Sequence, residues 1–393
     1  MPASRIRPFI YLVIAPVALL ALWLGGCERV SEPPQALAVE RAADVPPGLA
    51  AEWPNTDFSQ RTVELDEIQS GGPPKDGIPA IDQPRFISTG AAGAWLNNDE
   101  PVIVVRIDDD ARAYPLQILM YHEIVNDRVG GLPVAVTFCP LCNASIVFER
   151  ELDGVTLDFG TTGRLRMSDL VMYDRQTESW WQQFTGKGII GQYAGTELTE
   201  VRSQITSFAD FRAAYPAGKV LSRATGFSRP YGHNPYRGYD NINQTPFLLD
   251  DPADPRLPPM ERVLGISVGD QHRVHPFSEL ERHPVINSEF VGVPYVVFTK
   301  DGVRSALDAG QIAESRTVPA AVAFRRSGVQ GVYTFTVRDG RIFDEQTGSE
   351  WNLFGESVAG SRAGEKLDPV PGGVHFAFAW LAFRPDTEVS RLP

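Results

Sequence analysis

The chain is poor in cysteine and in positive charge. It has three cysteines among 393 residues, and 36 Lys+Arg against 49 Asp+Glu give a formal charge of −13. An acidic chain without a basic cluster lacks the phosphate contacts that drive nucleic-acid binding, which excludes a nucleic-acid partner. The sequence has no second Cys pair for a four-sulfur zinc knuckle, no Gly-x-Ser-x-Gly motif, no Walker loop and no dinucleotide fingerprint. No nucleotide cofactor is therefore indicated.

What is present is enough apolar sequence for a large core. Hydrophobic residues make up 43% of the chain and charged residues 22%, which excludes a disordered or fibrous protein. The 35 glycines and 32 prolines favour many turns and short strands over long helices. We expect a mainly β fold, a β-rich α+β protein with short helices and many turns.

Residues 1–26 have the pattern of a lipoprotein signal peptide. Arg5 and Arg7 precede an apolar run over residues 9–24, which is short for a membrane span of about 20 residues. The Leu-Gly-Gly-Cys27 that follows resembles the bacterial lipobox, in which the cysteine becomes the lipid-bearing N-terminus. We expect Cys27 to anchor the protein in the cell envelope, on the periplasmic face of the outer membrane if the source is Gram-negative. An ordinary signal peptide or an uncleaved anchor is the alternative.

Residues 27–60 contain several prolines and little periodicity, which predicts a lipid-anchored spacer. Beyond it, the chain matches itself: a shift of 161 residues (261 − 100) places 100–137 on 261–298, with identities that include Asp109/Asp270, Arg112/Arg273 and His122/His283. The match resumes at a shift of 170 (344 − 174) with an Asp-x-x-Thr-x-Ser-x-Trp motif. We therefore expect two homologous lobes from an internal duplication: lobe one over 61–222, an inter-lobe loop over 223–254, and lobe two over 255–393.

The repeated segments predict particular local structures. Residues 101–107 and 133–138 are apolar and read as strands, and residues 108–110 read as a turn between strands. Short helices are expected over about 115–121 and 208–215. The repeated Asp-x-x-Thr-x-Ser-x-Trp motif suits a hairpin turn with side-chain caps and a core tryptophan, because both lobes keep it.

Cys139 and Cys142 form the most informative motif, a Cys-Pro-Leu-Cys at the end of an expected strand that lobe two does not share. Such a pair can ligate one metal or close a small disulfide. Residue 143 is Asn rather than His, so no c-type haem site is indicated. Copper or zinc suits thiolates combined with imidazole, and Met167 or Met172 are weaker ligand candidates.

His122 is the candidate third ligand. It lies seventeen residues before Cys139, and His122-Glu123 begins like a zincin helix, but Asn126 replaces that motif's second histidine. Lobe two keeps a histidine, His283, but has Lys300 where Cys139 would align. An imidazole bonded to a strand carbonyl would need no metal, and this structural alternative stays open for His122.

The inter-lobe loop is rich in Gly, Pro and Tyr and is either a packed lid or a connector. Tyr231, Tyr236 and Tyr239 are candidate ligand-binding residues. Aromatic residues in such a loop more often pack the loop against the protein, and this second interpretation is favoured.

Several motifs in order resemble a bacterial and archaeal extracytoplasmic family known as domain-of-unknown-function family 3179. They lie at residues 71–82, 112–115, 122–127, 137–142 and 170–174, and the similarity spans roughly residues 70–390. The resemblance implies a shared fold without an established activity. Within the family pattern, His122 and Cys139 are the more general pair, because some members have another residue at the second cysteine.

Three functions remain open. The first is a metal-binding envelope lipoprotein using His122, Cys139 and Cys142, with a redox role as an extension. The second is a non-enzymatic module that binds a ligand or partner and has a structural Cys139–Cys142 disulfide. The third is a thiol-disulfide protein, which a duplicated β-rich chain disfavours because it lacks the thioredoxin βαβ order.

Overall fold

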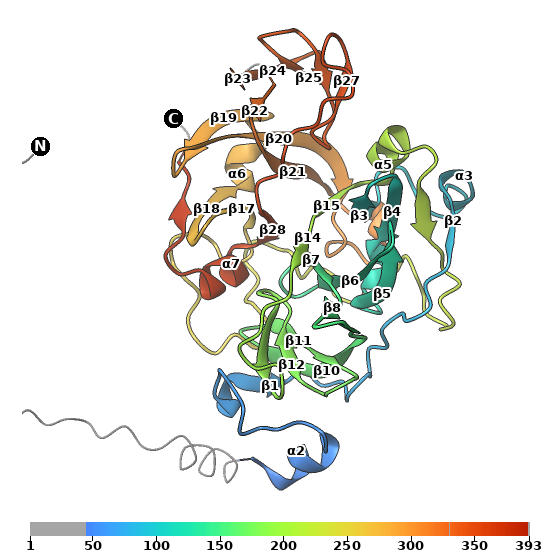
Figure 1. Cartoon of the computed structure of the whole chain (residues 1–393), viewed down its shortest axis with the longest axis vertical. Helices are drawn as coiled ribbons and strands as arrows, with labels where there is room; N and C mark the ends of the chain where they lie inside the picture. The colour runs from blue at the N-terminus through green and yellow to red at the C-terminus, as the bar shows by residue number, and fades with distance from the viewer. Residues whose placement is uncertain (1–44, 330, 392–393) are drawn as a thin grey trace, which may run out of the picture.

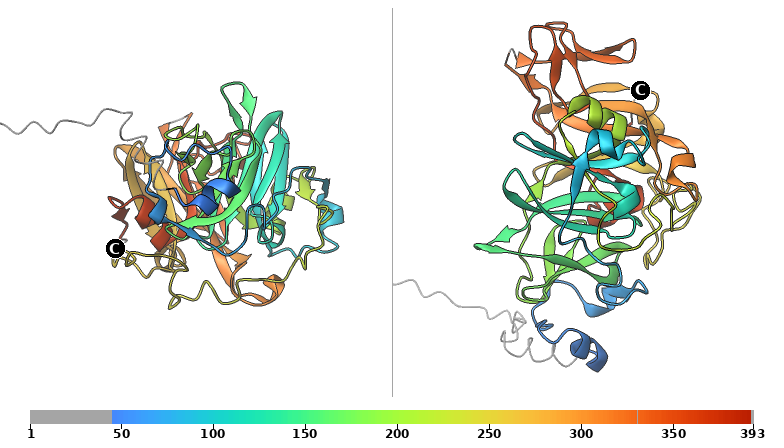
Figure 2. Two further views of the ribbon diagram at one scale, coloured as in Figure 1. Left: turned by 90° about the horizontal axis from the view of Figure 1, so that it is seen from below. Right: turned by 90° about the vertical axis from the view of Figure 1, so that its right-hand side faces the viewer.

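The computed structural model describes residues 45–329 and 331–391, so the signal peptide and Cys27 lie outside the described residues. The fold is mainly β, with 42% strand and 11% helix in several largely antiparallel sheets. The molecule is elongated, with β10–β12 toward one end and β24–β27 at the other (Figures 1 and 2).

The residues predicted to form lobe one contain three main sheets. The first has the order β1-β10-β11-β12-β13, with strands Ile68–Ser70, Phe159–Arg166, Asp169–Asp174, Trp180–Gln182 and Lys187–Ile190. The second has the order β14-β7-β6-β5, with strands Glu200–Val201, Ala144–Glu149, Leu132–Cys139 and Ile124–Val129. The third has the order β15-β3-β4-β16-β2, with strands Ser203–Ser207, Pro101–Ile107, Asp110–Pro115, Lys219–Leu221 and Phe86–Ser88. A small hairpin joins β8 and β9, Glu151–Leu152 and Val155–Thr156. The helical segments up to the end of this lobe are α2, η1, α3, α4 and α5: Pro47–Glu52, Leu65–Glu67, Thr89–Ala92, Leu116–Leu119 and Phe208–Ala214.

The residues predicted to form lobe two also contain three main sheets. The first has the order β28-β17-β18-β29, with strands Gly372–Phe376, Arg262–Val268, Gln271–Pro276 and Glu388–Val389. The second has the order β19-β20-β21, with strands Val285–Phe290, Val293–Arg304 and Thr317–Arg325. The third has the order β24-β25-β26-β27, with strands Phe335–Arg338, Arg341–Asp344, Glu350–Trp351 and Ser357–Ala359. A hairpin joins β22 and β23, Ser327–Gly328 and Gly331–Val332, and the helical segments α6, η2 and α7 span Phe277–Leu280, Ile312–Glu314 and Ala377–Phe383.

The local predictions agree with these elements. The predicted turn at 108–110 joins β3 to β4, the strand predicted at 133–138 lies within β6, and the two predicted helices are α4 and α5. The repeated Asp-x-x-Thr-x-Ser-x-Trp motif forms a capped turn in both lobes. Asp174 accepts hydrogen bonds from the Thr177 backbone and from the Trp181 indole, and Asp344 does the same with Thr347 and Trp351. The structural interpretation of this motif is therefore confirmed.

Residues 45–60, the described part of the predicted spacer, pack against the rest of the protein. They contain α2, and the Trp53 side chain that follows the helix is only 1% exposed. Its ring lies 4.9 Å from Tyr173 and 5.1 Å from Trp180, edge to face. Two apolar anchors, Trp53 and Phe58, hold this segment on the β11–β12 surface.

One continuous hydrophobic core joins the lobes. It includes β6 and β7 residues of lobe one together with Val263, Phe376 and Trp380 of lobe two. The Phe184 ring of lobe one lies 4.9 Å from the His375 ring and 6.2 Å from Trp380. Because apolar burial is the main source of stability, the two lobes support each other. Within the described residues, no helix is long and apolar enough to span a membrane.

Candidate metal centre

The two cysteines lie in the hairpin loop between β6 and β7. Cys139 ends β6 and pairs with Ala144 at the start of β7, which places residues 140–143 in a tight loop. Asn143 completes the loop with a left-handed φ of 50°. The Cys142 carbonyl accepts a hydrogen bond from the Phe376 backbone of lobe two at 2.9 Å, so lobe two helps to fix the loop. Both cysteines are buried free thiols in this structure, rather than the disulfide that one interpretation required.

Asp169 approaches the cysteines from a second hairpin. It begins β11 directly after the two-residue turn Met167-Ser168, in which φ is 51° and 64°. Two left-handed residues in succession match the twist of a tight hairpin, but they are costly for side chains other than glycine. The Asp169 Oδ2 atom accepts hydrogen bonds from Gln182 Nε2 at 2.6 Å and from the Phe184 backbone at 2.9 Å. The other oxygen, Oδ1, is buried and has no hydrogen-bond partner within the described chain.

Cys139, Cys142 and Asp169 form a buried group that can hold a metal ion. One ligand atom from each residue lies within 4.8 Å of the other two. The side chains are 2%, 0% and 0% exposed, so water does not solvate them freely. The Cys142 Sγ atom also contacts the Ser168 carbonyl oxygen at 3.5 Å, which connects the two hairpins.

Burial controls the protonation of this group. It raises the pKa of both thiols, and it raises the pKa of Asp169 to about 6. Desolvation disfavours the charged form of each acid, and the neighbouring acidic groups add to the effect at the thiols. Around neutral pH the cysteines are therefore thiols, which are poor nucleophiles, and Asp169 is a carboxylate.

Glu123 is a further buried acid close to this group. It follows α4, has a left-handed φ of 56° and is 6% exposed. Burial and the Asp169 charge raise its pKa to about 8. Its carboxyl group makes no hydrogen bond with another described residue. Backbone strain at four non-glycine residues around the cysteines and Asp169, namely Glu123, Asn143, Met167 and Ser168, is typical of functional sites.

A cavity of about 530 Å³ lies beside the group, and we call it the Glu123 cavity. Leu141, between the two cysteines, and Leu170, next to Asp169, belong to its wall together with Glu123. Tyr236 and Tyr239 of the inter-lobe loop line the same cavity. The loop is thus packed against the protein and also borders a hollow space, and a ligand-binding role for its tyrosines stays a prediction.

His122 and Tyr231 have a structural arrangement. The Nδ1 atom of His122 lies 2.7 Å from the Pro79 carbonyl oxygen, and its Nε2 atom lies 2.6 Å from the Tyr231 hydroxyl. The Tyr231 hydroxyl also contacts Thr225 Oγ1 at 2.6 Å. Both ring nitrogens are occupied, as the structural alternative for His122 requires. In this structure Asp169, and not His122, stands with the two cysteines.

The family model for a protein of unknown function, DUF3179, matches residues 75–387. The chain belongs to this family. Among curated proteins and among solved structures, the searches found no match. The family match includes every residue of the candidate metal centre and the whole inter-lobe loop.

The sequence did not identify Asp169 as a member of the metal group. It also did not predict that the Glu123 carboxyl group lacks a hydrogen-bond partner. The sequence shift of 170 residues aligns Asp169 with an aspartate, Asp339, so a comparison of the lobes gave no reason to single out Asp169, although Asp339 lies in the β24–β25 turn of the structure. The unusual Met-Ser turn before Asp169 was the available signal. Met172 is fully buried in the core and Met167 lies in that turn, so their role as thioether ligands stays a prediction.

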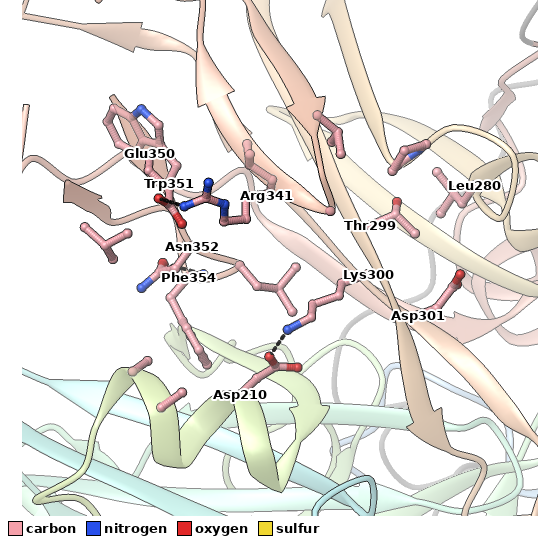
Figure 3. A pocket seen from close by; sticks show the side chains of 18 of the residues that line it. Asp210, Leu280, Thr299, Lys300, Asp301, Arg341, Glu350, Trp351, Asn352 and Phe354 are labelled. Atoms are coloured by element: carbon pink, nitrogen blue, oxygen red, sulfur yellow. Dashed lines mark hydrogen bonds and ion pairs between the residues drawn. The ribbon is translucent and has the colours of Figure 1, made fainter. Parts of the chain in front are cut away.

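A second cavity, also about 530 Å³, lies between α5 and the β20, β25 and β26 region of lobe two. Figure 3 shows ion pairs between Lys300 and Asp210 and between Arg341 and Glu350 in its wall. We call it the Lys300 cavity. Neither cysteine nor Asp169 lines it, so it is separate from the candidate metal centre.

Proposed function

We propose that this protein binds a transition metal ion through Cys139, Cys142 and Asp169, with zinc as the favoured ion. The convergence of the three ligand atoms within 4.8 Å carries this proposal. The unpartnered Oδ1 atom of Asp169 supports it, because a buried polar atom without a partner is costly and a metal would satisfy it. A metal would also offset the charge of two buried thiolates and one carboxylate.

The donor set favours zinc over copper. Zinc accepts cysteine sulfur and aspartate oxygen together, whereas copper(I) prefers soft sulfur donors alone. Three protein ligands are one fewer than a closed tetrahedral zinc site has, and Glu123 and its cavity lie next to them. A redox role would require copper rather than zinc. This role is an extension of the proposal, and copper in the purified protein would support it.

The buried thiols support metal binding better than thiol exchange. Exchange needs an accessible thiolate, whereas both cysteines here are buried and have a raised pKa. Burial favours the thiol form of both cysteines, but a bound metal ion would favour the thiolate form, because ligation requires the thiolate.

We also propose an envelope location, with Cys27 carrying the lipid anchor and the signal peptide removed. The Leu-Gly-Gly-Cys27 sequence and the preceding apolar run support this location. The described fold would then stand outside the membrane, attached through residues 27–44.

We further propose that the lobes arose by internal duplication and that only lobe one kept the metal site. Two observations support it: the β15-β3-β4-β16 order of lobe one has its counterpart in β28-β17-β18-β29, and both lobes contain the capped Asp-x-x-Thr turn. Lys300 and Pro284 stand where Cys139 and Glu123 would align, so the second copy lacks the site.

The test is metal analysis of the purified full chain, followed by competition for zinc against a chelator. One zinc per chain is expected, with both thiols protected from modification while the ion is bound. Cys139→Ser should abolish stoichiometric zinc, and Asp169→Asn should weaken zinc binding by roughly 10- to 100-fold, because a neutral amide replaces the charged carboxylate ligand. Asp339→Asn, at the matching position of lobe two, is the control and should bind zinc normally.

Zinc bound equally well by Cys139→Ser and by Asp169→Asn would overturn the proposal. Stoichiometric copper that excludes zinc would keep the site but replace the ion. Each variant is first compared with the parent chain by circular dichroism, so that a loss of zinc is read only from folded protein.

A further inference from the structure

The Glu123 cavity has mostly apolar walls. They are formed by lobe one and by the end of the inter-lobe loop: Pro73, Ile78, Leu141, Leu165, Leu170, Pro246, Phe247 and Leu248. Its volume of about 530 Å³ falls within the usual range of small-molecule sites. Phe247 is 47% exposed, so one wall of the cavity reaches the protein surface.

Among the polar side chains that line this cavity, Glu123 is a buried one without a described hydrogen-bond partner. Glu123 is more than nine-tenths buried and lines the cavity, yet its carboxyl group has no hydrogen bond within the described residues. Tyr236 also lines the cavity, and its hydroxyl has no hydrogen-bond partner among the described residues, whereas the Tyr239 hydroxyl accepts a hydrogen bond from the Phe247 backbone at 3.1 Å. Buried polar groups normally have partners, so Glu123 points to a ligand that supplies one, and the partly buried Tyr236 lies in the same wall.

The charges of the wall limit the ligand's chemistry. Arg164 is the one basic residue among the lining residues, and it already pairs with Glu52 at 2.9 Å. An anionic ligand would meet the buried acids Glu123 and Asp169, and the one guanidinium in the wall is already paired with a carboxylate. An ammonium ligand carries three donors, which an apolar cavity with one acid serves poorly.

We propose that the Glu123 cavity binds a neutral, mostly apolar small molecule that carries a carbonyl or similar oxygen at one end. The oxygen lies at Glu123 and Tyr236, and the apolar body lies against Leu141, Leu165 and Phe247. This binding does not need the metal, so a failure at one site leaves the other proposal standing.

The test uses prodan, a neutral naphthalene ketone whose fluorescence changes when it enters an apolar site. We expect one prodan per chain, with a blue-shifted emission. Glu123→Leu should weaken binding at least 10-fold, whereas Glu123→Gln, which keeps a hydrogen-bond donor, should stay within about 3-fold of the parent chain. Phe247→Ala should weaken binding several-fold, because the probe loses part of its apolar wall.

Matched variants separate the possible sites. Val358→Ala changes the Lys300 cavity, and it should leave prodan binding unchanged. Cys139→Ser should still bind prodan, which separates this result from the loss of metal. Equal prodan binding by Glu123→Leu, Phe247→Ala and the parent chain would overturn the proposal. So would tighter binding of the cationic probe naphthylmethylamine, or of the anionic probe anilinonaphthalene sulfonate, than of prodan.

Discussion

Glu123 shows how one residue can combine burial, strain and a shifted pKa. Its backbone has a φ of 56°, its side chain is 6% exposed, and its pKa is raised to about 8. Non-glycine residues adopt this backbone region at a cost, which suggests that the surrounding fold holds Glu123 in place for a use other than stability. The cavity beside the cysteines is the use that its position favours.

The raised pKa of Glu123 predicts a pH dependence of stability. The unfolded chain loses this proton near pH 4.5 and the folded chain near pH 8, so the folded state binds more protons in between. The group's contribution is therefore complete below pH 4.5 and is lost as the pH rises toward 8. Glu123→Gln should remove about 4 kcal/mol of the fall in unfolding free energy between pH 5 and pH 8.5.

Urea unfolding of the metal-free chain at both pH values measures this difference. Glu281→Gln, at an exposed position in lobe two, is the control and should keep the pH dependence of the parent chain. The same pH dependence in Glu123→Gln and in the parent chain would show that Glu123 ionises normally in the fold.

At the scale of the element, the inter-lobe loop is held at two points along its length. Tyr231 contacts His122 of lobe one, and Asp240 is buried against lobe two. The Asp240 carboxylate accepts hydrogen bonds from Arg262 and Arg316, each with a shortest distance of 2.8 Å. Burial opposes the charge of Asp240, but the two guanidinium groups outweigh it and lower its pKa. Tyr236 and Tyr239 lie between these two attachments, which explains why they can form a stable cavity wall.

Asp240→Asn should be strongly destabilising, because it leaves the buried Arg262 without its carboxylate. Removing one partner of a buried ion pair costs about 3 to 5 kcal/mol. Asp254→Asn breaks the Asp254–Arg256 pair, which is partly exposed, and should cost less than about 1 kcal/mol. Unfolding free energies of the two variants give the comparison, and equal losses would contradict a structural clamp at Asp240.

The sequence predicted elements better than it predicted contacts between them. The helices α4 and α5, the β3–β4 turn and the capped Asp174 turn follow from local patterns, which are set by residues close in the chain. Local patterns could not predict Asp169 as the third member of the metal group. It is thirty residues from Cys139 in the chain, and only the packing of two hairpins brings them together. Apolar anchoring by Trp53 was missed for the same reason: its partners lie more than a hundred residues away.

At the scale of the whole molecule, two buried histidines connect stability to acid pH. His275 and His375 are 1% and 2% exposed, and burial lowers their pKa to about 4 and about 3. The Nε2 atom of His275 lies 2.8 Å from the Tyr295 hydroxyl. The Nδ1 atoms of both histidines have no hydrogen-bond partner within the described chain. His375 also lies at the contact between the lobes, against Phe184 of lobe one.

Both histidines should make the protein sensitive to acid. The unfolded chain takes up a proton on each below pH 6.5, whereas the folded chain stays neutral, so the unfolded state binds more protons and stability falls with falling pH. Between pH 7 and pH 5 each histidine should remove about 2 kcal/mol from the unfolding free energy. The loss continues until the pH reaches the folded pKa of each group.

His375→Phe tests this prediction at the junction of the lobes. Phenylalanine keeps an aromatic ring beside Phe184 and Trp380 but cannot titrate. Between pH 7 and pH 5, the unfolding free energy of the variant should therefore fall by about 2 kcal/mol less than that of the parent chain. Urea unfolding at both pH values measures this difference. His233→Gln, at an exposed position in the inter-lobe loop, is the control and should follow the parent chain. If His375→Phe also follows the parent chain, the acid sensitivity arises away from the lobe junction, since no other titrating group was changed.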